Sequence, residues 1–289
     1  DVVHAHLPHM ELLSYLSILG NNKSKFIITK HVDNDYLGGS NTKKNSYISS
    51  IISYFIYSRV NKIIAISHSV KKFLIETSFQ DIRKKIKVIY YGLDDFYINK
   101  CLRKNKKNFI KKNSKFTFGF IGRLVKQKQV DKIIISFKKY LDEFNNDAML
   151  LIVGSGPEKK ELLNLSRKLK LNNKIIWQDF RDDVGETLDQ IDVFCINSAF
   201  EGLGLVMLEA MANSKPIIGP NVSAIPEVIK DNENGLLVKP DDIDDYKNAM
   251  IKITDLNIRS KLSANSVKYL NNNFDYQIMI SKINEVYDF

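Results

Sequence analysis

The chain has 289 residues, of which 44% are hydrophobic and 26% are charged. This composition is typical of a soluble globular protein, and the length is enough for two ordinary domains. The sequence has no signal peptide and no apolar stretch long enough to cross a membrane, which disfavours exported and membrane-spanning classes. The net charge of +10 leaves nucleic acid, anionic lipid and phosphorylated ligands as candidate partners.

Only two cysteines occur, Cys101 and Cys195. They provide neither a disulfide framework nor the ligand spacing of a zinc site, which favours a reducing compartment. Cys195 lies in an apolar run and is expected to be a small core residue. We therefore expect a cytoplasmic protein.

Strand-like and helix-like patterns alternate along the first 95 residues. After a strand-like run at the start, strands are predicted at Phe26–Thr29, Lys62–Ile66 and Ile86–Tyr90, and helices at Tyr47–Ser58 and Ser69–Thr77. Ser67 and Ser69 are candidate N-caps of the second helix. This alternation predicts a parallel sheet with helices on its faces.

A basic segment follows, because residues 99–115 hold eight basic side chains and no acidic one. We interpret residues 96–113 as a solvated linker between two domains. Attraction to an anionic membrane surface is an alternative that we leave open. Nucleic-acid binding is disfavoured because few aromatic side chains lie among the basic ones.

The second region repeats the order strand, loop, helix. Strands are predicted at Phe116–Ile121, Ala148–Val153, Lys174–Trp177, Asp192–Ile196, Pro216–Gly219 and Gly235–Val238, and helices at Val130–Phe144, Glu158–Leu169, Val184–Gln190, Glu201–Asn213 and Ile225–Ile229. Gly154 and Gly235 are interpreted as turn residues. Residues 114–272 thus predict a doubly wound domain, and a final helix at Tyr276–Tyr287 belongs to a last segment, 273–289. Two such domains would enclose a cleft, which is a favoured ligand site.

The most informative motif is the run E-G-L-G-L-V-M-L-E from Glu201 to Glu209. Its Gly-rich turn opens into a predicted helix, whose free N–H groups favour an anion. Gly202 and Gly204 remove side chains where a phosphate would approach the backbone. A carboxylate at Glu209 can accept hydrogen bonds from two neighbouring hydroxyls. These features together indicate a nucleoside diphosphate sugar, although two glutamates at this spacing also occur by chance.

The surroundings of the motif strengthen this interpretation. Glu201 follows the predicted strand Asp192–Ile196 and a short loop. In open α/β sheets, ligands bind at the carboxyl ends of the strands. The apolar positions Leu205, Leu208 and Ala212 repeat at helical spacing, which indicates that a helix follows the Gly-rich turn.

Two basic residues, Arg123 and Lys128, come just after the predicted strand Phe116–Ile121. A guanidinium fork and a lysine point charge both suit a diphosphate. Such cations could hold a leaving diphosphate in place of a metal ion. Lys126 is equally basic, so the pattern does not choose between it and Lys128. Ordinary surface bases in a lysine-rich chain remain the alternative.

Four of the five histidines lie near the start of the chain: His4, His6, His9 and His31. On a strand, His4 and His6 would lie on the same face. No carboxylate cluster accompanies them, so we expect no metal site. His31 follows a strand and could face the cleft, with a structural or surface role as the alternative.

With these residues in order, the chain resembles glycosyltransferase family 4, which has the GT-B fold. The segment from Ser198 to Ala212 resembles the family's E-x7-E signature. The run I-Y-Y-G-L-D from Ile89 and the run D-V-V-H-A-H-L-P from Asp1 resemble two segments of its N-terminal domain. The resemblance covers nearly the whole chain and is strongest from Phe118 to Pro240. It implies an α/β protein with two Rossmann-like, doubly wound parallel-sheet domains facing a cleft.

The resemblance also implies an activity. Members would transfer a hexose from a UDP- or GDP-linked sugar to a glycan, lipid-linked or small-molecule acceptor, with retention of the anomeric configuration. They would need no metal ion and no cofactor. The first domain would lie on the acceptor side, and the last helix would cross back to it. A cytoplasmic location fits this activity, with peripheral contact with the inner face of an anionic membrane as an open alternative. We expect no nucleic-acid partner.

The resemblance implies roles for the residues of this chain that match the family's functional positions. Glu201 and His31 would be catalytic: Glu201 contacts the donor sugar, and His31 contacts it or assists proton transfer. Glu209 would bind the ribose hydroxyls, and Arg181 would lie near the nucleobase. The full set implied for donor binding is Arg123, Lys128, Arg181, Gly202, Gly204, Leu205 and Glu209.

The chain departs from the family pattern at several points. Gln129 stands where relatives often have Gly, and Asp179-Phe180 replaces a Gly-containing loop. The family's opening strand and Gly-rich loop have no counterpart, which predicts an incomplete N-terminal domain. A nucleotide-sugar-binding protein without useful catalysis is therefore the alternative function. A sugar-nucleotide epimerase on the same fold is also possible, but the glutamate pair favours transfer.

Overall fold

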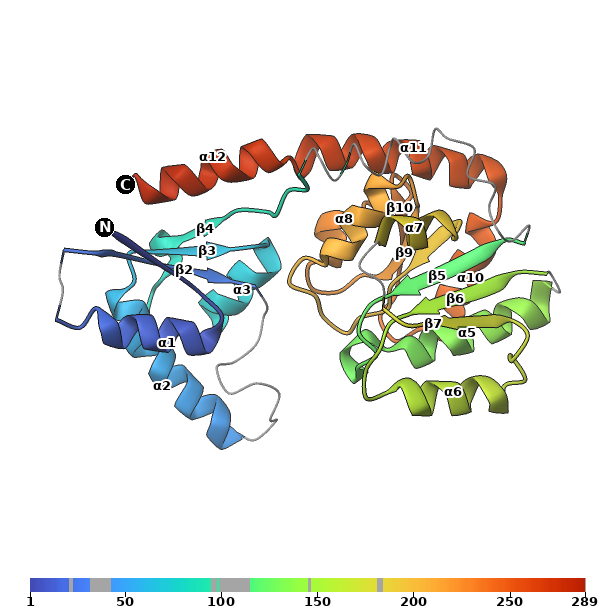
Figure 1. The fold of residues 1–289 in the computed structure, drawn as a ribbon, viewed down its shortest axis with the longest axis horizontal. Helices are drawn as coiled ribbons and strands as arrows, with labels where there is room; N and C mark the ends of the chain where they lie inside the picture. The colour runs from blue at the N-terminus through green and yellow to red at the C-terminus, as the bar shows by residue number, and fades with distance from the viewer. Residues whose placement is uncertain are drawn as a thin grey trace. The chain divides into compact units, whose positions relative to one another are not determined.

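A computed structural model describes residues 1–20, 23–31, 43–94, 98, 115–144, 147–180 and 184–288. The chain forms two compact units (Figure 1). Unit 1 comprises Asp1–Gly92, Glu201–Leu203 and Gln277–Phe289, and unit 2 comprises Leu93–Phe200 and Gly204–Tyr276. Unit 1 is therefore assembled from both ends of the chain.

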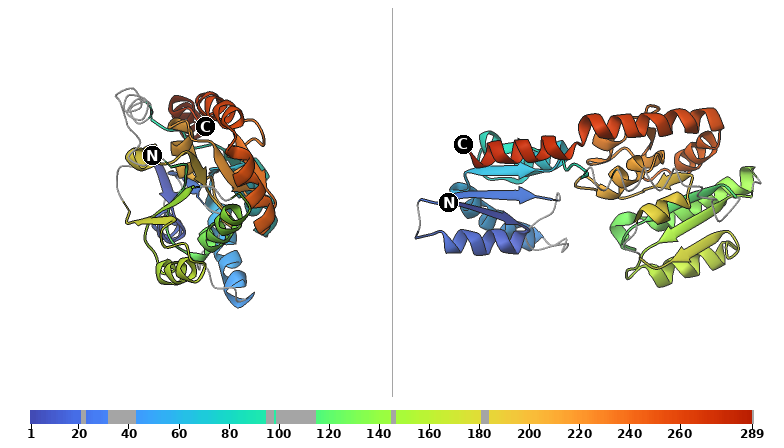
Figure 2. Two further views of the ribbon diagram at one scale, coloured as in Figure 1. Left: turned by 90° about the vertical axis from the view of Figure 1, so that its right-hand side faces the viewer. Right: turned by 45° about the horizontal axis from the view of Figure 1, so that its top comes forward.

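Unit 1 is built on a four-stranded parallel sheet in the order β1-β2-β3-β4. The strands are β1 (Val2–His6), β2 (Lys25–Lys30), β3 (Lys62–Ala65) and β4 (Ile86–Val88), and the helices are α1 (Pro8–Ser17), α2 (Lys43–Arg59), α3 (His68–Thr77), the 3-10 turn η1 (Arg83–Lys85) and α12 (Tyr276–Tyr287). Figures 1 and 2 show α1 and α12 on opposite sides of this sheet. The parallel alternation of strand and helix confirms the predicted class.

Local signals explain several of these boundaries. The Ser67 hydroxyl caps α3 by accepting from the backbone N–H of Val70 at 3.1 Å, as its position predicted. The last strand ends at Val88, two residues before the predicted end. The helix α1 was not predicted, although Pro8 stands in its first turn, where proline is well tolerated.

A buried ion pair fixes α1 against the sheet. The Lys30 ammonium on β2 lies 3.0 and 3.1 Å from the two carboxylate oxygens of Glu11 on α1. The Lys30 and Glu11 side chains are only 6% and 1% exposed, so both charges have been removed from water. Such charges are tolerated only when paired with good geometry.

Helix α12 is held in unit 1 by polar contacts along its length. The Tyr287 hydroxyl lies 2.7 Å from the His4 ring, and the Lys25 ammonium donates to the Tyr287 carbonyl oxygen at 3.0 Å. Lys87 pairs with Glu285 at 2.5 Å. These contacts connect the first strand of the chain with its last helix.

Unit 2 contains a six-stranded parallel sheet in the order β10-β9-β8-β5-β6-β7. Its strands are β5 (Thr117–Ile121), β6 (Met149–Val153), β7 (Ile175–Gln178), β8 (Val193–Cys195), β9 (Ile217–Pro220) and β10 (Gly235–Val238). Its helices are the 3-10 turn η2 (Lys126–Lys128), α5 (Val130–Phe144), α6 (Lys159–Lys168), α7 (Val184–Asp189), α8 (Leu205–Ala212), α9 (Ile225–Val228), α10 (Ile243–Ile253) and α11 (Leu256–Asn273). Figure 1 shows α5 and α6 on one face of the sheet and α8 on the other. This is the doubly wound arrangement that was predicted.

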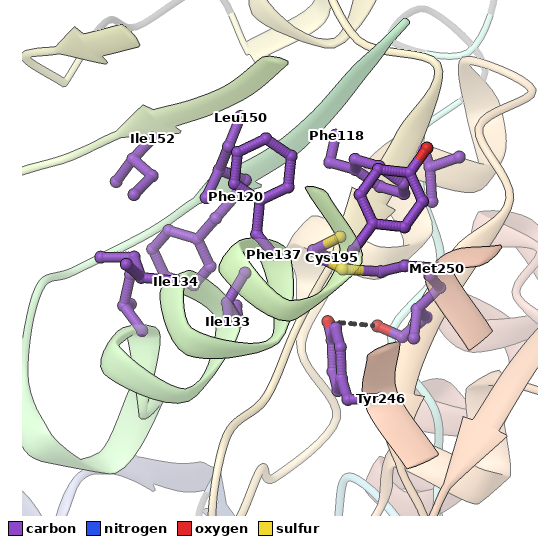
Figure 3. Close-up of a cluster of buried hydrophobic side chains, with 14 of the residues drawn as sticks. Phe118, Phe120, Ile133, Ile134, Phe137, Leu150, Ile152, Cys195, Tyr246 and Met250 are labelled. Carbon is purple, nitrogen blue, oxygen red and sulfur yellow. Dashed lines mark hydrogen bonds between the residues drawn. The ribbon is translucent and has the colours of Figure 1, made fainter. Parts of the chain in front are cut away.

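The core of unit 2 confirms the role expected for Cys195, which is fully buried in β8. Burial raises the pKa of its thiol to about 12, so the side chain behaves as a small apolar group. Figure 3 shows Tyr246 and Cys195 in this core, and the Tyr246 hydroxyl shares its proton between the carbonyl oxygens of Ile196 and Ile218 at 3.2 and 3.3 Å. Tyr246 thereby attaches α10 to the inner strands.

Candidate active site

The strand order places a topological switch point between β5 and β8. The chain runs from β5 outward to β7 and then returns to the other side of β5 to form β8, β9 and β10. Ligands bind outside the carboxyl ends of the strands at such a point. The segments after β5 and β8 carry the basic residues and the glutamate motif that the sequence singled out.

The segment after β5 presents Arg123 and Lys128. Arg123 is exposed, and Lys128 is half-buried at the end of η2. Lys126, which the pattern could not separate from Lys128, is exposed. The two lysines therefore differ in environment, and Lys128 has the more fixed position.

The neighbouring turn at Gly154 is a tight connection between strand and helix, as predicted. Gly154 has φ of 150°, and a Cβ atom there would overlap the carbonyl oxygen of Gly122. The Leu124 N–H donates to the Ser155 carbonyl oxygen at 2.8 Å. Glycine thus lets this turn pack directly on the Arg123 segment. Gly235, also interpreted as a turn residue, is instead the first residue of β10.

Two hydrogen bonds connect the η2 turn with the segment that precedes Glu201. The Ala199 N–H donates to the Gln127 carbonyl oxygen at 2.8 Å. The Gln127 amide donates to the Phe200 carbonyl oxygen at 2.8 Å. Lys128 and the glutamate motif are therefore brought to one end of the sheet. Nothing in the sequence pattern indicated Gln127.

The glutamate motif differs from the prediction at its start. A helix was predicted from Glu201, but α8 begins at Leu205, because Gly204 adopts the left-handed conformation with φ 80° and ψ 70°. Glu201 lies in the turn and is only 6% exposed. Glu209 lies in the second turn of α8 and is half-buried. In the first turn of α8, the Met207 N–H donates to the Gly204 carbonyl oxygen at 2.8 Å, whereas helix geometry gives the N–H groups of Leu205 and Val206 no acceptor within the helix.

The three apolar positions that repeat along this helix differ in burial. Leu208 and Ala212 are buried, whereas Leu205, the first helical residue, is 48% exposed.

In unit 1, histidine and tyrosine side chains form a row of hydrogen bonds at the carboxyl ends of the strands. The His31 ring follows β2 and lies 3.0 Å, Nε2 to Nδ1, from His6 at the end of β1. Its other nitrogen, Nδ1, lies 2.6 Å from the hydroxyl of Tyr91, which follows β4. His4 lies on the same strand face as His6, with ring centroids 4.3 Å apart, as predicted.

Burial controls the charge of this row. Burial, together with the nearby His6 and His31, lowers the pKa of His4 to about 4. Burial, then His6 and Lys30, lowers the pKa of His31. Burial also raises the pKa of Tyr91 to about 12. At neutral pH, His4 and His31 are therefore uncharged rings, and Tyr91 keeps its hydroxyl proton.

The start of the glutamate motif lies in unit 1. Glu201–Leu203 belongs to this unit, and a Cβ atom at Gly202 would overlap the carbonyl oxygen of His31. Gly202 is therefore required for close packing of the motif on the His31 backbone. This contact brings together the two residues that were expected to be catalytic, Glu201 and His31, within one unit.

Other expectations concern metal binding and the nucleobase loop. Over the residues that the structure describes, no group of three or more His, Cys, Asp or Glu side chains is placed to hold a metal ion. Arg181, expected near the nucleobase, lies outside the described residues. The neighbouring Phe180 is exposed, and Asp179 pairs with Lys159 at 2.6 Å.

The comparisons with known proteins identify the family. The description "Glycosyl transferases group 1" matches residues 103–269, and "Glycosyltransferase Family 4" matches residues 1–95. The chain belongs to this glycosyltransferase family, which confirms the resemblance seen in the sequence. In the described part of the chain, no helix is long and apolar enough to cross a membrane.

Two relatives illustrate the range of the family. The N-acetyl-alpha-D-glucosaminyl L-malate synthase of Bacillus anthracis is 30% identical over 249 residues, which is 84% of this chain and 62% of that protein. The UDP-Gal:alpha-D-GlcNAc-diphosphoundecaprenol alpha-1,3-galactosyltransferase of Escherichia coli is 28% identical over 296 residues. This alignment covers 99% of this chain and 75% of that protein. The chain thus spans less than two thirds of the first of these relatives.

Solved structures confirm the GT-B type of fold. Anabaena HepE in complex with UDP and glucose has a TM-score of 0.82 at 19% identity, covering 100% of this chain and 77% of that one. The sucrose-phosphate synthase of Thermosynechococcus elongatus has a TM-score of 0.81 at 18% identity, and the match covers 99% of this chain and 73% of that one. At these identities, the likeness concerns the fold.

Proposed function

We propose that this protein transfers a hexose, with retention, from a nucleoside diphosphate sugar to a glycan, lipid-linked or small-molecule acceptor. The observation that carries the proposal is the pair of hydrogen bonds from Gln127, which join the Lys128 turn to the segment before Glu201 at the switch point of unit 2. UDP is the favoured nucleotide, because the names of the galactosyltransferase and of the HepE complex both contain it.

The donor diphosphate is assigned to the two cations and the start of α8. Arg123 offers a planar donor fork and Lys128 a point charge, which together would offset the charge of the leaving diphosphate without a metal ion. The free N–H groups at Gly204 and Leu205 add a partial positive charge. The exposure of Arg123 and of Leu205 leaves this end of unit 2 accessible to a ligand.

The ribose and the donor sugar are assigned to the two glutamates. Glu209 would accept hydrogen bonds from the ribose hydroxyls. Glu201, a buried carboxylate in a turn that Gly202 and Gly204 make compact, would contact the donor sugar. Arg181 remains our prediction for the nucleobase. His31 contributes to the catalytic side through the row of hydrogen bonds that it shares with His6 and Tyr91.

Unit 1 would supply the acceptor side, and the nature of the acceptor stays open. A cytoplasmic location is proposed from the cysteine usage, and peripheral contact with an anionic membrane is proposed from the net charge of +10. Most of the basic segment 99–115 lies outside the described residues. A second function, nucleotide-sugar binding without useful catalysis, is the alternative that the turnover measurement below tests.

Calorimetry with UDP, GDP and ADP tests the donor site. Lys128→Ala and Glu209→Ala should each weaken UDP binding by about tenfold to a hundredfold, since a hydrogen bond to a charged group contributes about 1.5–3 kcal/mol. Lys126→Ala is the matched control and should bind UDP as the wild type does. If the folded wild type bound no nucleotide, or if the Lys126 and Lys128 variants behaved alike, the assignment would be wrong.

Turnover separates the two functions. A transferase releases UDP from a UDP-sugar when an acceptor is supplied, and Arg123→Ala combined with Lys128→Ala should abolish that release. A binding protein would retain UDP affinity and release no UDP with any acceptor in a panel of glycans, lipid-linked sugars and small hydroxyl compounds.

A further inference from the structure

Gln129 combines two unusual features beside the cation Lys128. Its backbone is left-handed, with φ 46° and ψ 44°, a conformation that is strained for a residue with a side chain. Its side chain is half-buried and lies among polar groups of α5, of the end of β8 and of the turn before α10, all in unit 2. Strained backbone persists where surrounding contacts hold it, and it clusters at functional sites.

The neighbours of the Gln129 amide determine its orientation. With Nε2 toward Asp241, the amide would donate at 3.3 Å, but its oxygen would face another oxygen and its N–H groups would face an ammonium. In the opposite orientation, Nε2 donates to the Asn197 carbonyl oxygen at 2.9 Å and the amide oxygen accepts from Lys132 at 2.8 Å. The second orientation satisfies both of these neighbours and is the one that their hydrogen-bonding capacity requires.

Lys132 and Asp241 hold the amide in this orientation. The Lys132 ammonium, on the first turn of α5, also pairs with the Asp241 carboxylate. Because a lysine side chain has donors and no acceptor, it can bond the Gln129 oxygen but not its N–H groups. The N–H groups of the amide therefore point away from Lys132, and one of them meets Asn197.

The Gln129 bond completes a set of contacts on both sides of Lys128. On one side, Gln127 is joined to the segment after β8 by two hydrogen bonds. On the other side, Gln129 reaches the same segment at Asn197, a residue that is only 4% exposed. A cation whose backbone is held on both sides keeps its position before the ligand arrives, and such preorganisation favours affinity.

We propose that Gln129 is a positioning residue of the donor site: by donating to Asn197, it fixes the Lys128 backbone on the segment after β8 and so prepares the lysine for the donor diphosphate. This inference rests on the proposed transferase function and adds a residue to its site. A glycine would adopt the same backbone without strain but could not make the bond. The side chain therefore has a role that the turn alone does not require.

Two substitutions separate the amide from the backbone strain. Gln129→Gly removes both, whereas Gln129→Met keeps the length of the side chain and the strain but cannot donate. Lys170→Gly is the control, because Lys170 is also left-handed, with φ 58°, and is exposed. Lys170 precedes β7, toward the amino ends of the parallel strands and away from the candidate site.

Calorimetry with UDP measures the affinity, and urea unfolding measures the stability of the same variants. Both Gln129 variants should bind UDP about threefold to tenfold more weakly than the wild type, because each loses one neutral hydrogen bond that positions Lys128. The Gly variant should nevertheless be more stable than the Met variant, because only the Met variant keeps the strain. A merely structural Gln129 would instead give UDP affinities that follow the stabilities. Lys170→Gly should bind UDP as the wild type does.

A second measurement addresses the orientation of the amide. Nitrogen-15 NMR should find one side-chain amide proton of Gln129 that exchanges slowly with water, because it is bonded to the buried Asn197. Lys132→Met removes the group that holds the amide oxygen and should speed this exchange. Fast exchange of both amide protons in the wild type would contradict the bond to Asn197.

The outcomes are distinct. If both Gln129 variants bound UDP like the wild type, or if Lys170→Gly weakened binding equally, the positioning role would be overturned, while Lys128→Ala would still report on the nucleotide site. If the folded wild type bound no nucleotide at all, the transferase proposal would fail first.

Discussion

The Gln127 side chain donates a hydrogen bond of 2.8 Å to the carbonyl oxygen of Phe200, the residue before Glu201. The two partners lie 73 positions apart in the sequence, on the segments that follow neighbouring strands of one sheet. Within unit 2, the contact thus sets the position of the Lys128 turn relative to the segment that leads into the glutamate motif.

Replacing Gln127 with Glu should weaken UDP binding. A carboxylate cannot donate to the Phe200 carbonyl and would repel it, so we expect about a fivefold to tenfold loss of UDP affinity with an unchanged circular dichroism spectrum. Calorimetry measures the loss. Gln190→Glu is the control, because the Gln190 amide donates to the Glu186 carbonyl oxygen of α7 and accepts from the Gln178 amide of β7, neither of which belongs to the segments that Gln127 joins. Equal effects of both substitutions would contradict the prediction.

The buried Glu11–Lys30 pair should be sensitive to loss of either partner. Glu11→Leu or Lys30→Met alone leaves the other buried charge without this ion-pair partner, and each should lower the free energy of unfolding by about 3–5 kcal/mol. The double variant should lose much less than the sum of the two. Urea unfolding measures all three.

The exposed pair Lys72–Glu76 on α3 is the control for this cycle. Its nitrogen and oxygen lie 3.9 Å apart, and its side chains are 76% and 61% exposed. Glu76→Ala should change the free energy of unfolding by no more than about 0.5 kcal/mol. A Glu11 variant as mild as this one would show that the buried pair contributes no specific stability.

Gln129 should impose backbone strain that glycine relieves. It has φ 46° and ψ 44°, a left-handed conformation that costs a residue with a side chain about 1–2 kcal/mol. Gln129→Gly and Gln129→Ala both remove the side-chain amide, but only the Ala variant keeps the strain. We expect the Gly variant to be more stable by about 1 kcal/mol in urea unfolding. Equal stability, or a more stable Ala variant, would contradict this.

His4 should make stability depend on pH. Burial lowers its pKa from 6.5 to about 4 in the folded chain, so between these values the unfolded chain binds more protons. The resulting stability is present above about pH 6.5 and is lost as the pH falls toward 4. His4→Gln cannot titrate and should lose less stability than the wild type between about pH 7 and about pH 5.

Urea midpoints at both pH values measure this difference. His9→Gln is the control, because His9 is exposed, and its pH dependence should match that of the wild type. If His4→Gln were as pH-sensitive as the wild type, the loss would belong to other groups.

Periodicity and turn residues predicted much of the fold. The six strands of unit 2 lie where apolar runs placed them, and α12 has the predicted bounds Tyr276–Tyr287. The order of strands also placed the segments of Arg123 and Glu201 at carboxyl ends, because parallel strands all point the same way. The bounds of α10 and α11 were not predicted, and α8 began late because the left-handed Gly204 ends the turn before it.

The finer features of the site depend on contacts between distant segments. Burial distinguishes Lys128 from Lys126, although the two are chemically equal in sequence. The row from Tyr91 through His31 to His6 joins side chains from the ends of three strands. The rule that ligands bind at the carboxyl ends of strands could have indicated Tyr91, which follows β4. It could not have indicated the hydrogen bonds that connect Tyr91, His31 and His6.

The composition of unit 1 also affects the order in which the chain becomes structured. Unit 2 is complete once residue 276 has been synthesised, since its segments lie between Leu93 and Tyr276. In contrast, His4 and Lys25 are made early but contact Tyr287, and Lys87 pairs with Glu285. On the ribosome, the sheet of unit 1 therefore waits for residues 277–289, although its four strands are synthesised before any strand of unit 2.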